Sequence, residues 1–112
     1  MASKITLQPN PSFKHTVLLP LAGKAEPEAL ELTFKHKTRS QIQDIFTNGF
    51  TPLTGEGEDG DTKFFMDFVS GWDIDADFTA ENVTAFLENY SGAGQFIWFE
   101  YINEIGKARV GN

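Results

Sequence analysis

The spacing of apolar residues changes along the chain, and this change constrains the fold more than any other feature. In residues 29–35, ALELTFK, apolar and polar side chains alternate, which predicts a strand with one buried and one exposed face. Residues 13–19, FKHTVLL, also have strand character. The segment between them contains two prolines and a glycine and predicts a loop. The simplest arrangement of these segments is an antiparallel β-hairpin.

Beyond the hairpin, apolar residues recur at helical spacing. A capping-box signature, T-x-x-Q, begins at Thr38, and the first helix is expected to end at residues 48–49, Asn-Gly. A fourth helix is expected from about Gly94 to Ile105, and Thr79 is expected to cap the third. The second helix is expected to begin near Asp61, and its apolar stripe consists of Phe64, Phe65, Phe68, Val69 and Trp72.

These elements predict a single α+β domain, residues 1–112, with an N-terminal β-hairpin followed by a bundle of about four α-helices. A chain of 112 residues with 40% hydrophobic residues is large enough for one core. Residues 1–12 and 107–112 are expected to be loose tails, and residues 50–62 a flexible acidic loop.

The charge distribution argues against a nucleic-acid partner. The formal net charge is −7, and residues 40–106 contain thirteen acidic residues and a single Lys. Binding to phosphates draws most of its affinity from basic side chains, so the larger part of this chain would repel them. The chain has no Cys, no membrane-spanning apolar stretch and no signal-peptide pattern at its start. These features predict a soluble protein of a reducing cytoplasm.

Two short motifs match binding signatures only in part. Residues 55–60, GEGEDG, fit the glycine pattern of dinucleotide-binding domains, but Pro52 precedes them instead of a buried strand, and their acids would repel a pyrophosphate. Residues 73–77, DIDAD, resemble the start of a calcium loop. An EF-hand would then need Gly and Glu where the chain has Phe78 and Thr84. Neither motif predicts a cofactor or metal site.

No catalytic motif is recognisable in the sequence either. His15 and His36 lie on the two predicted strands and could face each other across the hairpin, but two histidines alone make a poor metal site. There is no nucleophile motif and no thiol. We therefore expect a protein that is not an enzyme and needs no cofactor.

The segment QFIWFEYINEI at residues 95–105 is apolar on almost every side of a helix. Trp98 and Tyr101 belong to one stripe, whereas Phe96 and Phe99 fall largely outside it. Such a helix either lies at the centre of the core or carries a contact surface, and the sequence leaves both interpretations open. The candidate partner-binding residues are Trp72, Phe96, Trp98, Phe99 and Tyr101.

Three segments together resemble a known family. They are TFKHKTRSQ at 33–41, VSGWDIDADFTAENV at 69–83, and FLENYSGAGQFIWFEYINEIGKARVGN at 86–112. This order, a G-W-D turn, F-T-x-E-N, a Tyr, small residues and a last aromatic helix, is similar to that of the tail assembly chaperones of long-tailed bacteriophages and prophages. The matching residues are Gly71, Trp72, Asp73, Phe78, Thr79, Glu81, Asn82, Leu87, Tyr90, Ala93 and Tyr101. The last helix is more aromatic than is typical of the family.

The resemblance implies a non-enzymatic role in the cytoplasm of the infected host cell. Members of this family coat the aggregation-prone tape measure protein, help to recruit tail tube subunits, and are absent from the finished virion. A frameshift often yields a longer form. The acidic charge and the absence of a long apolar stretch predict no nucleic-acid or membrane partner. Self-association is expected, because coating a long client needs many copies.

Two other functions compete with this interpretation. An acidic inhibitor or DNA mimic would bind a basic partner, and it predicts a row of carboxylates without an apolar contact patch. A structural virion subunit would remain in purified particles, whereas a chaperone would not.

Overall fold

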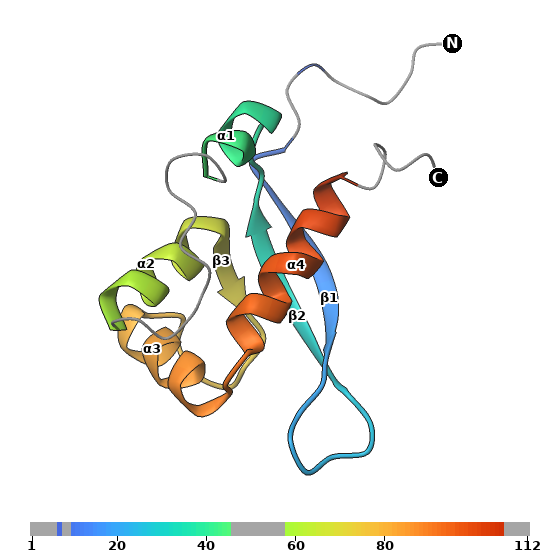
Figure 1. Ribbon diagram of the computed structural model, residues 1–112, viewed down its shortest axis with the longest axis vertical. Helices are drawn as coiled ribbons and strands as arrows, with labels where there is room; N and C mark the ends of the chain where they lie inside the picture. The colour runs from blue at the N-terminus through green and yellow to red at the C-terminus, as the bar shows by residue number, and fades with distance from the viewer. Residues whose placement is uncertain (1–6, 8–9, 46–57, 107–112) are drawn as a thin grey trace.

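The alternating segments form the predicted β-hairpin, and helices cover one face of it (Figure 1). The computed structural model describes residues 7, 10–45 and 58–106. Its elements are β1 (Ser12–Leu19), β2 (Glu28–Lys35), α1 (Arg39–Asp44), α2 (Glu58–Phe68), β3 (Val69–Trp72), α3 (Ala80–Asn89) and α4 (Ala93–Gly106). The prediction of an α+β fold with an N-terminal hairpin and four helices is confirmed.

The register of the hairpin follows the apolar pattern. Phe13 pairs with Phe34 and Val17 with Leu30, so the apolar residues of both strands share the face that the helices cover. The same register places Leu32 opposite His15. The expectation that His15 and His36 face each other is therefore wrong. His36 follows β2, and its backbone N–H donates to the carbonyl of Pro11 at 2.9 Å.

The largest difference from the sequence prediction lies after Phe68, where the chain changes from helix to strand. The predicted helical stripe continued through Val69 to Trp72, but these residues form β3. The strand runs antiparallel to β2, with Trp72 opposite Leu32, so the sheet order is β1-β2-β3. β3 pairs with the edge of β2 that faces away from β1. If Val69 to Trp72 continued α2 instead, the backbone N–H and C=O groups on that edge of β2 would lack this partner. Helix α2 also begins earlier than predicted, at Glu58.

The predicted helix caps are confirmed at two places. Thr38 and Gln41 form the complete capping box of α1. The Thr79 hydroxyl accepts a hydrogen bond from the backbone N–H of Asn82 at 3.2 Å and so caps α3. The predicted end of the first helix at 48–49, most of the predicted acidic loop at 50–62, and the tail at 107–112 lie outside the described residues. Of the predicted N-terminal tail, Ser12 already belongs to β1.

An aromatic cluster forms the core beneath the sheet. Phe68 lies at its centre, with ring centroids 4.9 Å from Trp98, 5.1 Å from Tyr101 and 6.2 Å from Phe34. Helix α4 crosses the sheet over β1, and α2 packs against α3 and β2 (Figure 1). The aromatic stripe of the last helix is therefore mainly a core element.

Candidate partner-binding groove

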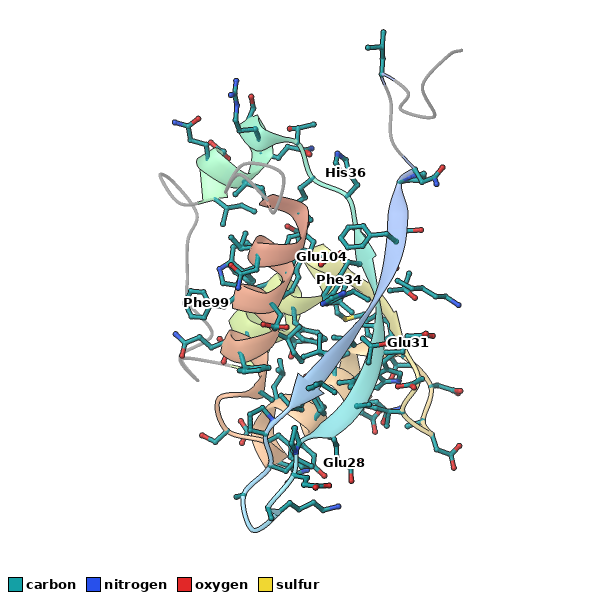
Figure 2. The ribbon with its side chains drawn as sticks, turned by 90° about the vertical axis from the view of Figure 1, so that its right-hand side faces the viewer. Glu28, Glu31, Phe34, His36, Phe99 and Glu104 are labelled. Atoms are coloured by element: carbon teal, nitrogen blue, oxygen red, sulfur yellow. The ribbon has the colours of Figure 1, made fainter. Side chains whose placement is uncertain are left out.

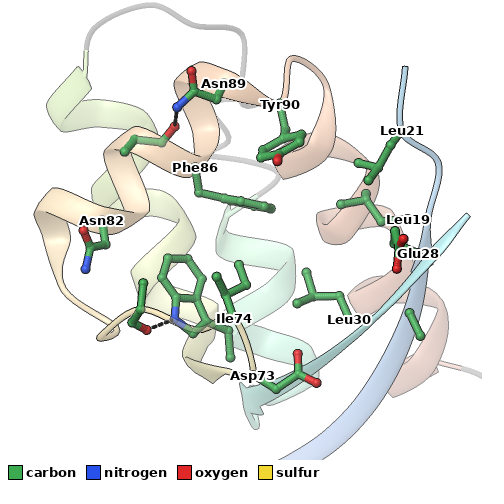
Figure 3. Close-up of a pocket in the computed structure, with 14 residues that line it drawn as sticks. Leu19, Leu21, Glu28, Leu30, Asp73, Ile74, Asn82, Phe86, Asn89 and Tyr90 are labelled. Carbon is green, nitrogen blue, oxygen red and sulfur yellow. Dashed lines mark hydrogen bonds between the residues drawn. The ribbon is translucent and has the colours of Figure 1, made fainter. Parts of the chain in front are cut away.

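An open apolar groove of about 430 Å³ lies between the end of the hairpin, the turn after β3 and one face of α3 (Figure 3). Its hairpin wall comprises Leu19, Leu21, Glu28, Ala29 and Leu30. Leu19 and Leu30 are buried and form the apolar floor, whereas Leu21 is half-buried and Ala29 is exposed. The groove is therefore continuous with the core at its floor and open to solvent at its rim.

The second wall is the turn that follows β3, and it is held by specific contacts. The indole Nε1 of Trp72 donates to the carbonyl of Ala76 at 2.8 Å, and the Phe78 ring meets the indole edge to face at 5.0 Å. The backbone of Asp73 bonds to Glu31 at 3.1 Å, and its Oδ1 accepts from the Glu31 N–H at 3.1 Å. These contacts fix the wall in one position, which lowers the ordering cost of binding a partner.

The third wall is one face of α3. Asn82, Ala85, Phe86, Asn89 and Tyr90 line the groove, at the spacing of neighbouring positions on a helix. The ring of Phe86 lies 5.7 Å from that of Trp72 and 5.4 Å from that of Tyr90, so the three aromatic side chains form a continuous apolar surface. Ala85 adds only a methyl group to this face, and its small size leaves the groove open.

The surroundings of the groove are acidic. Residues 64–106 contain eight acidic residues and no Lys, Arg or His. Glu28 and Asp73 line the groove itself. The turn also carries the exposed Asp75 and Asp77, and α3 carries Glu81 and Glu88. On the hairpin side, Lys24 pairs with Glu28 at 3.0 Å. The groove therefore has carboxylates at its rim and apolar side chains at its floor.

The structure separates the five candidate contact residues into two groups. Trp98 is 1% exposed and Tyr101 is fully buried. The hydroxyl of Tyr101 donates to the carbonyl of Lys35 at 2.7 Å, and burial, together with the nearby charge of Asp67, raises the pKa of Tyr101 above its usual range. In this structure these two side chains are core residues and are not presented to a partner.

The other three candidates are accessible, although not on one surface. Trp72 is half-buried in the groove. Phe99 is 52% exposed and projects from α4 on the side away from the sheet (Figure 2), and Phe96 is half-buried. A role of these residues in partner binding stays a prediction.

Several groove residues were not identified from the sequence. Leu30 lies in the predicted strand at 29–35, and Phe86 and Tyr90 lie in a segment that resembles the family, but no sequence pattern joins these residues into a site. Tyr90 is 45% exposed, although it lies at a core-like spacing from Val83 and Phe86. The available signal was Ala85, a small residue next to the large side chains of Phe86 and Tyr90 in the same segment.

The described residues offer no other obvious chemistry. Within residues 7, 10–45 and 58–106, no group of three or more His, Asp or Glu side chains could hold a metal ion. Among the helices of this part of the chain, none combines the length and the apolarity that crossing a membrane requires.

Comparison with known proteins agrees with the resemblance seen in the sequence. The family of phage tail assembly chaperones matches residues 1–112. No curated protein and no solved structure matches the chain. The family match covers the whole chain and implies protein partners in tail assembly. The chain therefore belongs to the phage tail assembly chaperone family.

Proposed function

We propose that this protein binds and solubilises the tape measure protein of its phage and helps to recruit tail tube subunits. Membership of the chaperone family supports a role in tail assembly. The observation that carries the choice of client is the open apolar groove, lined by Trp72, Phe86 and Tyr90 and surrounded by acidic residues. An apolar contact surface with solubilising charge around it suits a client whose own apolar stripe causes aggregation.

A second apolar contact is available on α4. Phe99 is a large hydrophobic side chain that is 52% exposed, so its ring is accessible to a partner. We propose that Phe99, with Phe96 beside it on the helix, adds to the contact with the client or with another copy of the chaperone. In this proposal Trp98 and Tyr101 do not contact the client and instead hold α4 in place by packing in the core.

In the proposed role, the protein acts without catalysis in the cytoplasm of the host bacterium and is absent from the mature virion. Self-association is part of the proposal, because a long client needs many copies to cover it. An acidic inhibitor or DNA mimic would present carboxylates without an apolar patch, so the groove favours the chaperone over this alternative.

Co-expression with the tape measure protein encoded in the same genome tests the proposal. We expect the client to become soluble and to co-purify with this protein. A client that stays insoluble and unbound would contradict the proposal. Mass spectrometry of purified virions tests the location, and stoichiometric amounts of this chain in the particles would identify a structural subunit instead.

A further inference from the structure

We propose that the groove binds an amphipathic helix whose apolar anchor residues are flanked by lysine or arginine. This inference rests on the proposed function, because it specifies the segment of the client that the chaperone recognises. It adds a requirement for positive charge to the requirement for apolar side chains.

The groove favours side chains as the means of contact. Its floor and walls are formed mainly by aliphatic and aromatic side chains from the hairpin, the turn after β3 and α3 (Figure 3). Asp73 ends the β2–β3 pairing by bonding to Glu31, and the chain then turns towards α3. A helix satisfies its own backbone hydrogen bonds and can insert a row of apolar side chains into such a groove without leaving backbone groups unpaired.

The charge around the groove specifies what flanks those anchors. Asp73, Asp75 and Asp77 lie on the turn wall or next to it, and residues 64–106 contain no Lys, Arg or His. Two lysines of the hairpin are already paired, Lys24 with Glu28 at 3.0 Å and Lys14 with Glu31 at 4.0 Å. A helix with glutamates beside its anchors would meet like charges, whereas lysine or arginine there would meet opposite ones.

Because the effect of a charge falls off with distance, acidic residues far from the groove provide a matched control. At physiological ionic strength, charges are screened over about 8 Å, so only acids beside the groove act strongly on its occupant. Glu104 lies towards the other end of the sheet from Glu28 (Figure 2). Glu104 and its helix neighbour Glu100 therefore allow the same loss of charge away from the groove.

The test uses the full chain and two synthetic helical peptides. Both have leucine at the anchor positions, and one has lysine and the other glutamate at the flanking positions. Affinity is measured by fluorescence anisotropy of the labelled peptides. We expect the lysine peptide to bind at least about tenfold more tightly at 0.15 M salt, with a smaller difference at high salt. Equal affinity for the two peptides would overturn the proposal.

Two pairs of variants locate the binding. Asp73→Asn with Asp75→Asn should weaken binding of the lysine peptide about threefold or more, whereas Glu100→Gln with Glu104→Gln should not. Ala85→Leu fills the groove from α3 and should abolish binding, whereas Ala80→Leu makes the same change off the groove. Urea midpoints close to wild type confirm folding. Unchanged binding by Ala85→Leu would overturn the proposal.

The outcomes separate this inference from the proposed function. If the tape measure protein co-purifies with the Ala85→Leu variant, the client binds elsewhere and only the groove proposal fails. If the lysine peptide binds but the client does not co-purify with wild type, the proposed function fails and the groove specificity stands. Loss of self-association in Ala85→Leu, without peptide binding by wild type, would assign the groove to a second copy and overturn the proposal.

Discussion

Replacing Trp98 by alanine should strongly destabilise the protein, because its indole is a central part of the core. The side chain is 1% exposed, and its ring lies 5.0 Å from Phe64, 4.9 Å from Phe68 and 5.7 Å from Tyr101. Truncation of a buried aromatic residue to alanine costs about 3–5 kcal/mol in the free energy of unfolding. A domain of 112 residues has about 6–17 kcal/mol in total, so the variant loses a large share of its stability.

Urea unfolding followed by far-ultraviolet circular dichroism measures this loss. The midpoint should fall by about 2 M, given the slopes that small domains show. Trp98→Phe keeps a ring in the cluster and provides a milder change if the alanine variant does not fold. Phe99→Ala is the matched control on the same helix and should change the free energy of unfolding by less than about 1 kcal/mol, because Phe99 is 52% exposed.

The two variants also distinguish core from contact. If Trp98→Ala melted like wild type and lost only client binding, the indole would be a contact group and the core assignment would be wrong. The expected opposite pattern for Phe99→Ala, normal unfolding with weakened client binding, would support a contact on α4.

Three further predictions concern single positions. Thr79→Ala removes the cap of α3 and should cost about 1 kcal/mol in urea unfolding, and Thr79→Ser should restore most of it. Gly92→Ala should cost about 1–2 kcal/mol by the same measurement, because φ there is +85°. Tyr101→Phe removes the hydrogen bond to the Lys35 carbonyl and should lower the free energy of unfolding by about 1 kcal/mol at pH 7. Because the pKa of Tyr101 is raised in the folded state, the unfolded state loses its phenol proton first as the pH rises above about 10. The contribution of Tyr101 to the free energy of unfolding is therefore present below about pH 10 and is lost as the pH rises further. Above about pH 10 the free energy of unfolding should fall less steeply in Tyr101→Phe than in wild type.

The parts of the fold that local patterns determine were predictable from the sequence. Alternation in residues 29–35 identified β2, and the side chains of Thr38 and Thr79 identified the starts of two helices. The strand at Val69 to Trp72 was not predictable in this way. Its apolar residues continue the helical spacing of Phe64, Phe65 and Phe68, and what makes them a strand is pairing with β2, which lies far away in the sequence.

The same limit applied to the site. Trp72 was a candidate contact residue, but its place in a groove depends on β3. The hairpin and α3 supply the other walls, and no local pattern indicates that these segments meet. The sequence left open whether α4 is a core helix or a contact surface, although it separated the stripe of Trp98 and Tyr101, which is buried, from Phe96 and Phe99.

The central position of β2 has a consequence for how the groove forms. Its pairing with β1 closes a short loop and is local, whereas its pairing with β3 joins segments on either side of α1 and α2. Contacts between distant segments form slowly, because closing a long loop costs conformational entropy before the contacts can stabilise it. Trp72 and Asp73 reach the groove only when β3 is in place, so a newly made chain should gain the groove late in folding. A partly folded chaperone with the hairpin alone would therefore present no groove to a client.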